Sequence, residues 1–310
     1  MIPFALIRAE SLQEALDCLS REGFKTKIIA GGTDLMVELR DLSADEKGPD
    51  TILDITPLDE IRGIKDDGKI ITVGALTPHR EISTSPIILQ YAPLLASACS
   101  TVGATQHRNI ATIGGNVING SPAADSVPAL VALNAEAVFR SQSGERVSLL
   151  KDIYLKPYQT DIKDDEILTA IRFPHLPDGA RSSYIKLGRR NALAISRMNV
   201  AVVLVIKEGK ITEARISPGS TTPTPDRITA AEAILIGEEP GEELFRRAGQ
   251  AVSDEMINRS GRRWSTPYKE PVIAALTTRA LMDAARRAGN SREEEGEGRS
   301  SRDEYGRAWV

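Results

Sequence analysis

The 310-residue chain has few cysteines and few aromatic residues. Its two cysteines, Cys18 and Cys99, are too few for a disulfide framework or for the thiolate ligands of an iron–sulfur cluster. Aromatic residues make up 4% of the chain, which disfavours the stacking surfaces that bind single-stranded nucleic acid. The net charge of −4 also argues against a nucleic-acid-binding protein, because such proteins present basic surfaces to phosphate.

Long apolar runs are missing as well. No stretch approaches the roughly 20 apolar residues that a membrane span requires. The short apolar run near the beginning is followed at once by Arg8 and Glu10, which is not typical of a signal peptide. The three histidines, His79, His107 and His175, show no metal-ligand spacing. We therefore expect a cytoplasmic protein with neither a membrane span nor a metal site of its own.

Three common nucleotide-binding and hydrolase motifs are absent: G-x-G-x-x-G, G-x-x-x-x-G-K-[ST] and G-x-S-x-G. The remaining composition, 41% hydrophobic and 26% charged residues, is that of an ordinary folded protein. A chain of this length has room for two or three domains.

Two glycine pairs, Gly31-Gly32 and Gly114-Gly115, are distinguished by their surroundings. The first lies between a predicted strand and a predicted helix. The second lies in the stretch 112–130, whose only charged residue is Asp125. Glycine lets backbone amides approach a ligand closely, and clustered amides bind phosphate. We therefore expect the two pairs to form turns that converge on one diphosphate.

The segments around these pairs resemble the two FAD diphosphate loops in the flavin subunit of molybdenum hydroxylases. That family includes xanthine dehydrogenase, nicotinate dehydrogenase and carbon monoxide dehydrogenase. The segments read AGGTDLMVELR at 30–40 and ATIGGNVINGSPAADSVPAL at 111–130. A third match is the family's T-x-x-x-x-x-E-I-L segment, which here begins at Thr160 and ends at Leu168. The resemblance extends over 4–288, nearly the whole chain.

The resemblance implies an α+β fold. A two-subdomain FAD-binding fold of the vanillyl-alcohol-oxidase type would be followed by a C-terminal domain with a three-stranded antiparallel sheet and three helices. We predict FAD-binding subdomains at 1–55 and 56–176 and the C-terminal domain at 177–288. The low hydrophobicity of 289–310 predicts a disordered tail.

The family pattern assigns cofactor-binding roles residue by residue. The two loops would hold the diphosphate, and Asp125 would accept a hydrogen bond from a ribose or ribityl hydroxyl. Lys186 would lie near the flavin ring and stabilise its anionic reduced form, and Leu168 would touch the ring edge. The expected cofactor-binding residues are Ala30, Gly31, Gly32, Thr33, Asp34, Leu35, Thr112, Gly114, Gly115, Asn116, Asn119, Asp125, Leu168 and Lys186. No catalytic residue and no metal ligand are assigned.

Some of these residues also have a purely structural interpretation. Asp125 could cap the helix predicted to begin at Val127, Lys186 could be a solvated strand lysine, and Leu168 could be a core residue. A carboxylate beside a diphosphate would repel it, so Asp34 is expected to point away and cap the following helix.

Two positions before the second glycine pair also bear on the cofactor. Arg108 is expected to support the loop around it. Val102 stands where some family members carry an aromatic residue against the flavin ring. This departure leaves the stacking partner of the ring, and the access of a nicotinamide to it, open.

The resemblance implies an FAD-binding electron-transfer subunit of a molybdenum-containing hydroxylase. The partners would be a small subunit with [2Fe–2S] clusters and a large subunit with molybdopterin. Electrons would pass from the clusters to FAD and then to an acceptor, expected to be NAD. The alternatives are a free-standing flavin oxidase of the same fold and an assembly module that has lost the cofactor.

Hydrophobic periodicity and turn residues predict the order of the elements. Helices are expected at 11–22, 36–40, 86–91, 93–99, 127–133, 228–236, 244–256 and 267–287, and one containing His79. Strands are expected at 25–30, 51–55, 70–73, 135–141, 145–149, 182–187, 200–207 and 211–217. A further segment, 171–173, is predicted to be an edge strand ended by Pro174.

Overall fold

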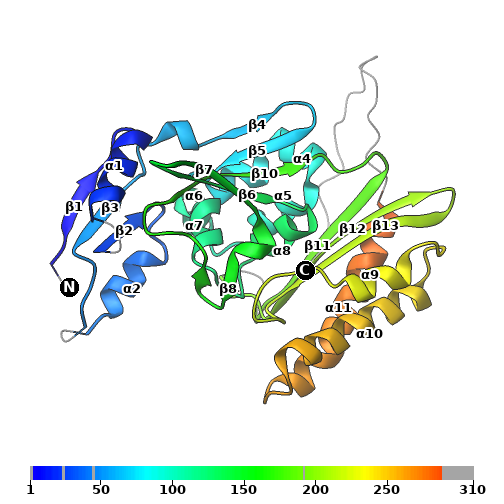
Figure 1. Ribbon diagram of the computed structural model, residues 1–310. Helices are drawn as coiled ribbons and strands as arrows, with labels where there is room; N and C mark the ends of the chain where they lie inside the picture. The colour runs from blue at the N-terminus through cyan, green and yellow to red at the C-terminus, as the bar shows by residue number, and fades with distance from the viewer. Residues whose placement is uncertain (1–2, 23–24, 44–45, 191–192, 288–310) are drawn as a thin grey trace.

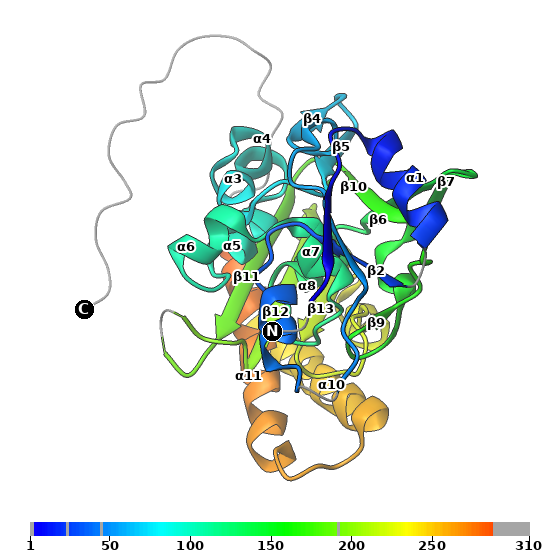
Figure 2. The same cartoon turned by 90° about the vertical axis from the view of Figure 1, so that its left-hand side faces the viewer.

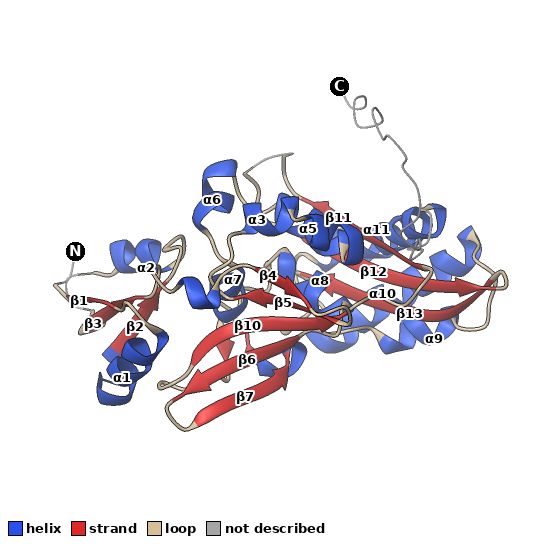
Figure 3. Cartoon of the chain, turned by 90° about the horizontal axis from the view of Figure 1, so that it is seen from above, coloured by secondary structure: helices blue, strands red, loops and turns tan. Residues whose placement is uncertain are grey.

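Three β-sheets of three or more strands follow one another along the computed structural model, which describes residues 3–22, 25–43, 46–190 and 193–287 (Figure 1). A small parallel sheet lies at one end, a five-stranded antiparallel sheet in the middle and a three-stranded antiparallel sheet at the other end (Figure 3). The predicted disordered tail lies outside the described residues. No helix in the described part of the chain is both long and apolar enough to cross a bilayer.

The first sheet is parallel throughout. Its strands, in spatial order, are β1 (Ala5–Arg8), β3 (Thr51–Asp54) and β2 (Thr26–Ile29). The predicted helices are present as α1 (Leu12–Glu22) and α2 (Leu35–Asp41). The sequence did not predict β1, because three of its four residues are exposed and it lacks the alternation of a half-buried strand.

The central sheet is antiparallel, and its middle strand corrects one prediction. Its strands, in spatial order, are β4 (Ile64–Asp66), β5 (Ile70–Gly74), β10 (Ile167–Pro174), β6 (Glu136–Ser141) and β7 (Gly144–Leu149). The predicted edge strand is therefore wrong, since β10 pairs on both sides. Pro174 is tolerated because it is the last residue of the strand, where a missing N–H removes no interior ladder bond. A separate two-stranded pair, β8 (Tyr154–Lys156) and β9 (Gln159–Thr160), follows β7.

Short helices fill the chain between β5 and β6. They are α3 (His79–Thr84), α4 (Pro86–Tyr91), α5 (Pro93–Ser100), α6 (Thr105–Ile110), α7 (Ile113–Ile118) and α8 (Ser126–Ala132). Viewed from the side of the small sheet, α3 to α6 lie on one side of the molecule, and β6 and β7 on the other (Figure 2). The second glycine pair lies inside α7, not in the predicted turn, because Thr112 caps this helix and starts it.

The C-terminal sheet lies between two groups of helices. Its strands are β11 (Ala180–Leu187), β12 (Met198–Lys207) and β13 (Lys210–Gly219). The three predicted helices are present as α9 (Thr229–Leu235), α10 (Glu242–Ser260) and α11 (Thr266–Arg286). On the face toward α10 and α11, the middle strand buries Met198, Val200, Val202 and Leu204. On the opposite face, toward α5 and α8, it buries Ala201, Val203 and Val205.

The two-sided burial of β12 explains its nearly continuous apolar sequence, because both sets of alternating side chains leave water. It also attaches the C-terminal sheet to the central part of the chain. Helix α8 packs against β12 and β13, and α5 packs against β11, and this junction positions the polar site described next.

Candidate functional site

The structure brings the two glycine segments into contact. A Cβ on Gly31 would lie 2.8 Å from the Cα of Ala111 and against the carbonyl oxygen of Ile110. Farther along both segments, Asn119 Nδ2 donates a hydrogen bond to Asp34 Oδ1 at 3.1 Å. The prediction that these distant stretches converge is therefore confirmed, and only glycine at position 31 allows the close approach.

The first segment presents unpaired backbone amides. It joins β2 to α2, and Gly32 has a φ of +68°, in the region that favours glycine. Within the described part of the chain, none of the amides from Gly31 to Leu35 donates a hydrogen bond. A run of five free amides beside a glycine turn can donate hydrogen bonds to an anion such as a diphosphate.

Asp34 lies at the N-cap position of α2, as predicted, but its side chain makes no capping hydrogen bond. Its carboxylate accepts hydrogen bonds from Asn119 Nδ2 and, at 3.4 Å, from Thr33 Oγ1. The capping prediction is therefore wrong, because tertiary contact with the second glycine segment holds the carboxylate instead.

The second segment does not present free amides, contrary to expectation. The amide of Ile113 donates to the carbonyl oxygen of Thr77 at 3.0 Å, and that of Gly114 to the carbonyl oxygen of Ala75 at 2.9 Å. The amide of Gly115 donates to Thr112 Oγ1 at 3.1 Å. These bonds start α7 and attach it to the end of β5. Because its amides are used in this way, the segment can border a ligand only with a backbone that carries few side chains.

Two asparagines follow the glycine pair along the second segment. Asn116 Oδ1 accepts a hydrogen bond from Ser126 Oγ at 2.7 Å. This bond fixes the orientation of the amide and leaves Nδ2 without an acceptor among the described residues. Asn119, at the C-terminal end of α7, is the residue that contacts the first segment.

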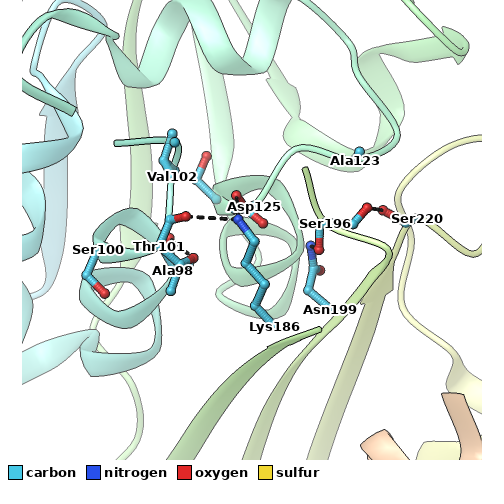
Figure 4. Close-up of polar contacts among 12 residues, drawn as sticks. Ala98, Ser100, Thr101, Val102, Ala123, Asp125, Lys186, Ser196, Asn199 and Ser220 are labelled. Atoms are coloured by element: carbon cyan, nitrogen blue, oxygen red, sulfur yellow. Dashed lines mark hydrogen bonds and ion pairs between the residues drawn. The ribbon is translucent and has the colours of Figure 1, made fainter. Parts of the chain in front are cut away.

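The expected residues Asp125 and Lys186 form a buried ion pair (Figure 4). Lys186 Nζ lies 2.6 Å from Asp125 Oδ2 and also donates to the carbonyl oxygen of Thr101 at 2.9 Å. Tyr184 donates its hydroxyl to Asp125 Oδ1 at 3.2 Å. Burial raises the pKa of Asp125, while the Lys186 ammonium and the Tyr184 hydroxyl favour its ionised form.

This arrangement rejects both structural interpretations of the pair. Asp125 lies at the N-cap position of α8, but its side chain makes no capping hydrogen bond. Lys186 is not a solvated strand lysine, because its side chain is only 10% exposed. The sequence analysis missed Tyr184, although it precedes Lys186 by two residues on β11 and therefore points to the same face of the strand.

The loop that ends at α6 is braced by the expected arginine. Arg108 Nη1 donates to the carbonyl oxygen of Val102 at 2.9 Å, and Nη2 donates to Thr105 Oγ1 at 3.2 Å. The predicted loop-supporting role of Arg108 is therefore confirmed. The same loop provides the carbonyl oxygen of Thr101 to Lys186, so Arg108 stabilises one side of the ion-pair site.

Leu168 lies on β10 beside a bulge and is 5% exposed, within the apolar core of the central part. The neighbouring Glu166 is also buried, and both its carboxylate oxygens accept hydrogen bonds from Arg146 at 2.7 Å. The acidic residue of the E-I-L sequence therefore has a structural partner. Contact of Leu168 with a flavin stays a prediction.

Comparison with known proteins gives matches over most of the chain. The family described as FAD binding domain in molybdopterin dehydrogenase matches residues 2–176, and the CO dehydrogenase flavoprotein C-terminal domain matches residues 183–284. The chain is 35% identical to the glyceraldehyde dehydrogenase medium chain of Sulfolobus acidocaldarius, over 91% of this chain and 98% of that protein. It is 28% identical to the carbon monoxide dehydrogenase medium chain of Hydrogenophaga pseudoflava, over 92% and 98%.

A solved structure has the same fold. The structure is that of carbon monoxide dehydrogenase from Hydrogenophaga pseudoflava, in a form lacking the Mo-pyranopterin moiety of the molybdenum cofactor. It superposes with a TM-score of 0.85 at 29% identity and covers 93% of this chain and 100% of that chain.

Proposed function

This chain belongs to the family of FAD-binding subunits of molybdopterin dehydrogenases, and on that premise we propose that it holds FAD between its two glycine segments. The observation that carries the proposal is the run of amides from Gly31 to Leu35 that are unpaired among the described residues, beside the segment that contains the second glycine pair. A diphosphate needs such donors, and the contact between the two segments supports its placement between them.

In this proposal the first segment, 30–35, binds the diphosphate through its amides and the Thr33 hydroxyl. Thr112, Gly114 and Gly115 form the opposite wall. Asn116 supports this role because its Nδ2 is fixed in direction and has no acceptor among the described residues. Asn119 Nδ2 donates a hydrogen bond to the Asp34 carboxylate, which would reduce the repulsion that a free carboxylate exerts on the diphosphate.

Asp125 and Lys186 would border the ribityl and ring end of FAD, with Leu168 at the ring edge. Lys186 is held in place by two acceptors, so its position requires no reorganisation when charge develops nearby. A fixed ammonium beside the ring would favour the anionic reduced form. When bound, FAD would supply the redox chemistry, since a flavin takes electrons singly and releases them as a pair.

We further propose that the FAD-binding part has the vanillyl-alcohol-oxidase type of fold, with subdomains at 1–55 and 56–176, and that 177–288 is the C-terminal domain. Three apolar clusters support this division, because each is centred on one of the three sheets.

The subunit would act in a complex with a small [2Fe–2S] subunit and a large molybdopterin subunit. It would take electrons from the clusters and pass them to an acceptor, for which we propose NAD. The names of its relatives support this role, since several are medium chains or FAD subunits of dehydrogenases. Cys18 and Cys99 are buried and form no disulfide, in keeping with a cytoplasmic site of action.

The visible absorption spectrum of the purified chain tests the proposal. We expect flavin bands, either as isolated or after addition of FAD and removal of the excess. Their absence after FAD addition would contradict the proposal and favour an assembly module without cofactor. Turnover of an organic substrate by the FAD-loaded chain alone would instead identify a free-standing oxidase.

A further inference from the structure

Asn199 lies in the middle of a row of residues that crosses the C-terminal sheet at the ion pair. It is on β12, directly opposite Lys186 on β11 and Gly219 on β13. Residues opposite each other in a sheet project from the same face, so the side chain of Asn199 stands beside that of Lys186 (Figure 4). Asn199 is fully buried, whereas the next three residues of β12 on this face are apolar. A buried amide in such a row calls for a reason.

Gly219 makes room for this amide. A Cβ on Gly219 would lie against Asn199 Oδ1 and 2.7 Å from Cγ of Pro128 on α8. The amide therefore occupies the space between β13 and α8. Pro128 is three residues after Asp125, so Asn199 packs beside the end of the helix that carries the carboxylate.

Hydrogen bonds fix the orientation of the amide. Ser196 Oγ donates to the carbonyl oxygen of Met198 at 3.1 Å, so it is an acceptor for Asn199 Nδ2, which also lies at 3.1 Å. Asn199 Oδ1 is buried and has no hydrogen-bond partner among the described residues. Nδ2 carries two hydrogens, and only one of them is used by Ser196. The polar group that Asn199 can offer to the ion pair is therefore a donor.

Asp125 is the acceptor that this donor serves. Burial raises the pKa of Asp125. Lys186, Tyr184 and Asn199 act in the opposite direction, because each favours the ionised carboxylate. The first two come from β11, so Asn199 is the contribution of β12. A further titratable group, Cys99 on α5, also faces Asp125, but burial and the charge of Asp125 raise the pKa of its thiol and keep it neutral.

We propose that Asn199 is a positioning residue: by donating to Asp125 it keeps this carboxylate ionised and directed at Lys186, and it thereby offsets part of the positive charge that Lys186 presents to the flavin. The first part concerns this chain alone. The second part rests on the proposed function, which places the flavin ring beside Lys186. A protonated Asp125 would leave the ammonium uncompensated, which would favour the anionic reduced flavin more strongly.

The proton affinity of Asp125 tests the first part without FAD. Carbon-13 NMR of the aspartate carboxyl groups follows protonation against pH, and the spectrum of Asp125→Asn identifies the signal. Asn199→Leu keeps a side chain of similar shape but removes the donor. We expect Asp125 to bind its proton about tenfold more tightly in Asn199→Leu, since a hydrogen bond to the ionised form is lost.

Ser217→Ala is the matched control. Ser217 is also fully buried and lies two residues from Gly219, on the same face of β13. Its hydroxyl donates to the carbonyl oxygen of Asp226 at 3.2 Å. This variant loses a buried hydrogen bond and should leave the proton affinity of Asp125 unchanged. Circular dichroism of each variant checks that the fold is intact.

The midpoint potential of bound FAD, measured against pH, tests the second part. The potential should rise where Asp125 becomes protonated. In FAD-loaded Asn199→Leu this rise should begin at a proton concentration about tenfold lower than in the unaltered chain, and Ser217→Ala should follow the unaltered chain. A purely structural role of Asn199 would weaken FAD binding or lower the melting temperature without moving this pH profile.

Three results would overturn the proposal. The first is an equal proton affinity of Asp125 in the unaltered chain and in Asn199→Leu. The second is an equal change in Asn199→Leu and Ser217→Ala, which would indicate a general loosening of the fold. The third is a potential that varies with pH identically in the unaltered chain and in Asn199→Leu. If the chain holds no FAD, the proposed function fails, whereas the NMR titration still decides whether Asn199 acts on Asp125.

Discussion

Lys186 on β11 reaches Asp125 at the start of α8, with Nζ 2.6 Å from Oδ2 and both side chains about nine-tenths buried. The pair joins the C-terminal sheet to the helical segment that follows the second glycine pair. It therefore links two parts of the chain that lie 61 residues apart. Its burial makes the charges dependent on each other, since neither has water as an alternative partner.

Removal of one member of this pair should therefore be costly. We expect Lys186→Met to lower the free energy of unfolding by about 3–5 kcal/mol, because Asp125 would remain buried without its cation. The double variant Lys186→Met/Asp125→Asn should recover a large part of that loss. Urea denaturation of the FAD-free chain, analysed as a double-mutant cycle, measures the coupling. A loss below about 1 kcal/mol in the single variant would mean that water replaces the lysine.

Two buried tyrosines allow a matched comparison of hydroxyl groups. Tyr184 donates to Asp125, whereas the hydroxyl of Tyr154 is buried without a partner among the described residues. Tyr184→Phe should destabilise the chain by about 1.5–3 kcal/mol, the range for a hydrogen bond to a charged group. Tyr154→Phe should be neutral or stabilising, because it removes an unsatisfied polar group. Equal losses of unfolding free energy in the two variants would show that the hydrogen bond from Tyr184 to Asp125 does not stabilise the fold.

His79 should make the stability sensitive to acid. Burial and, to a smaller extent, the positive charge of Arg108 together lower its pKa to about 4. The folded state therefore keeps His79 neutral at pH values below 6.5, where the unfolded chain, in which this histidine has its ordinary pKa of 6.5, binds a proton. The part of the unfolding free energy that depends on neutral His79 is present above pH 6.5 and is lost as the pH falls toward about 4. The loss has a limit of roughly 3 kcal/mol.

The check is the difference in unfolding free energy between the unaltered chain and His79→Phe, measured at several pH values. The unaltered chain should lose more stability than the variant between pH 6.5 and 4. His107→Gln changes an exposed histidine on α6 and should follow the unaltered chain. Parallel curves for the unaltered chain and His79→Phe would refute the prediction.

Gly31→Ala should weaken FAD binding more than it affects folding. The added methyl group would press on the Ile110 carbonyl oxygen and separate the two glycine segments. Overpacking of this kind costs about 1–3 kcal/mol, and a tenfold loss in FAD affinity corresponds to about 1.4 kcal/mol. Gly241→Ala is the matched control, because a Cβ there meets nothing within 4 Å and its φ of −161° suits any residue.

Retained flavin absorbance after gel filtration measures this difference, and circular dichroism checks the fold of each variant. Flavin retention by Gly31→Ala equal to that of Gly241→Ala would mean that the contact between the segments is not needed for binding.

Local sequence predicted many of the elements well. The helix predicted at 11–22 is present as α1, and Ser11 Oγ, just before it, accepts a hydrogen bond from the amide of Glu14 at 3.2 Å. The strands β11 to β13 and the helices α9 to α11 also lie where periodicity placed them. Each of these depends on interactions within one or two turns or along one strand, which a short window of sequence contains.

The failures have physical causes of another kind. Gly114-Gly115 is typical of a turn, but the cap by Thr112 and the hydrogen bonds to the end of β5 stabilise a helix there instead. Pro174 is typical of an edge, but the buried residues before it place β10 in the middle of its sheet. Tertiary contacts outweighed the local preference of the glycine pair, which amounts to about 1 kcal/mol per glycine in a helix, whereas Pro174 costs no interior ladder bond at the end of its strand.

The sequence alone therefore determined the family, the order of most elements and the identity of two segments poor in side chains, because these depend on residue type and near neighbours. Only the tertiary structure decided which amides remain free among the described residues, and that Asp125 binds Lys186 and Tyr184. Such pairings join residues tens of positions apart. They depend on how whole elements pack against each other, which no local sequence pattern specifies.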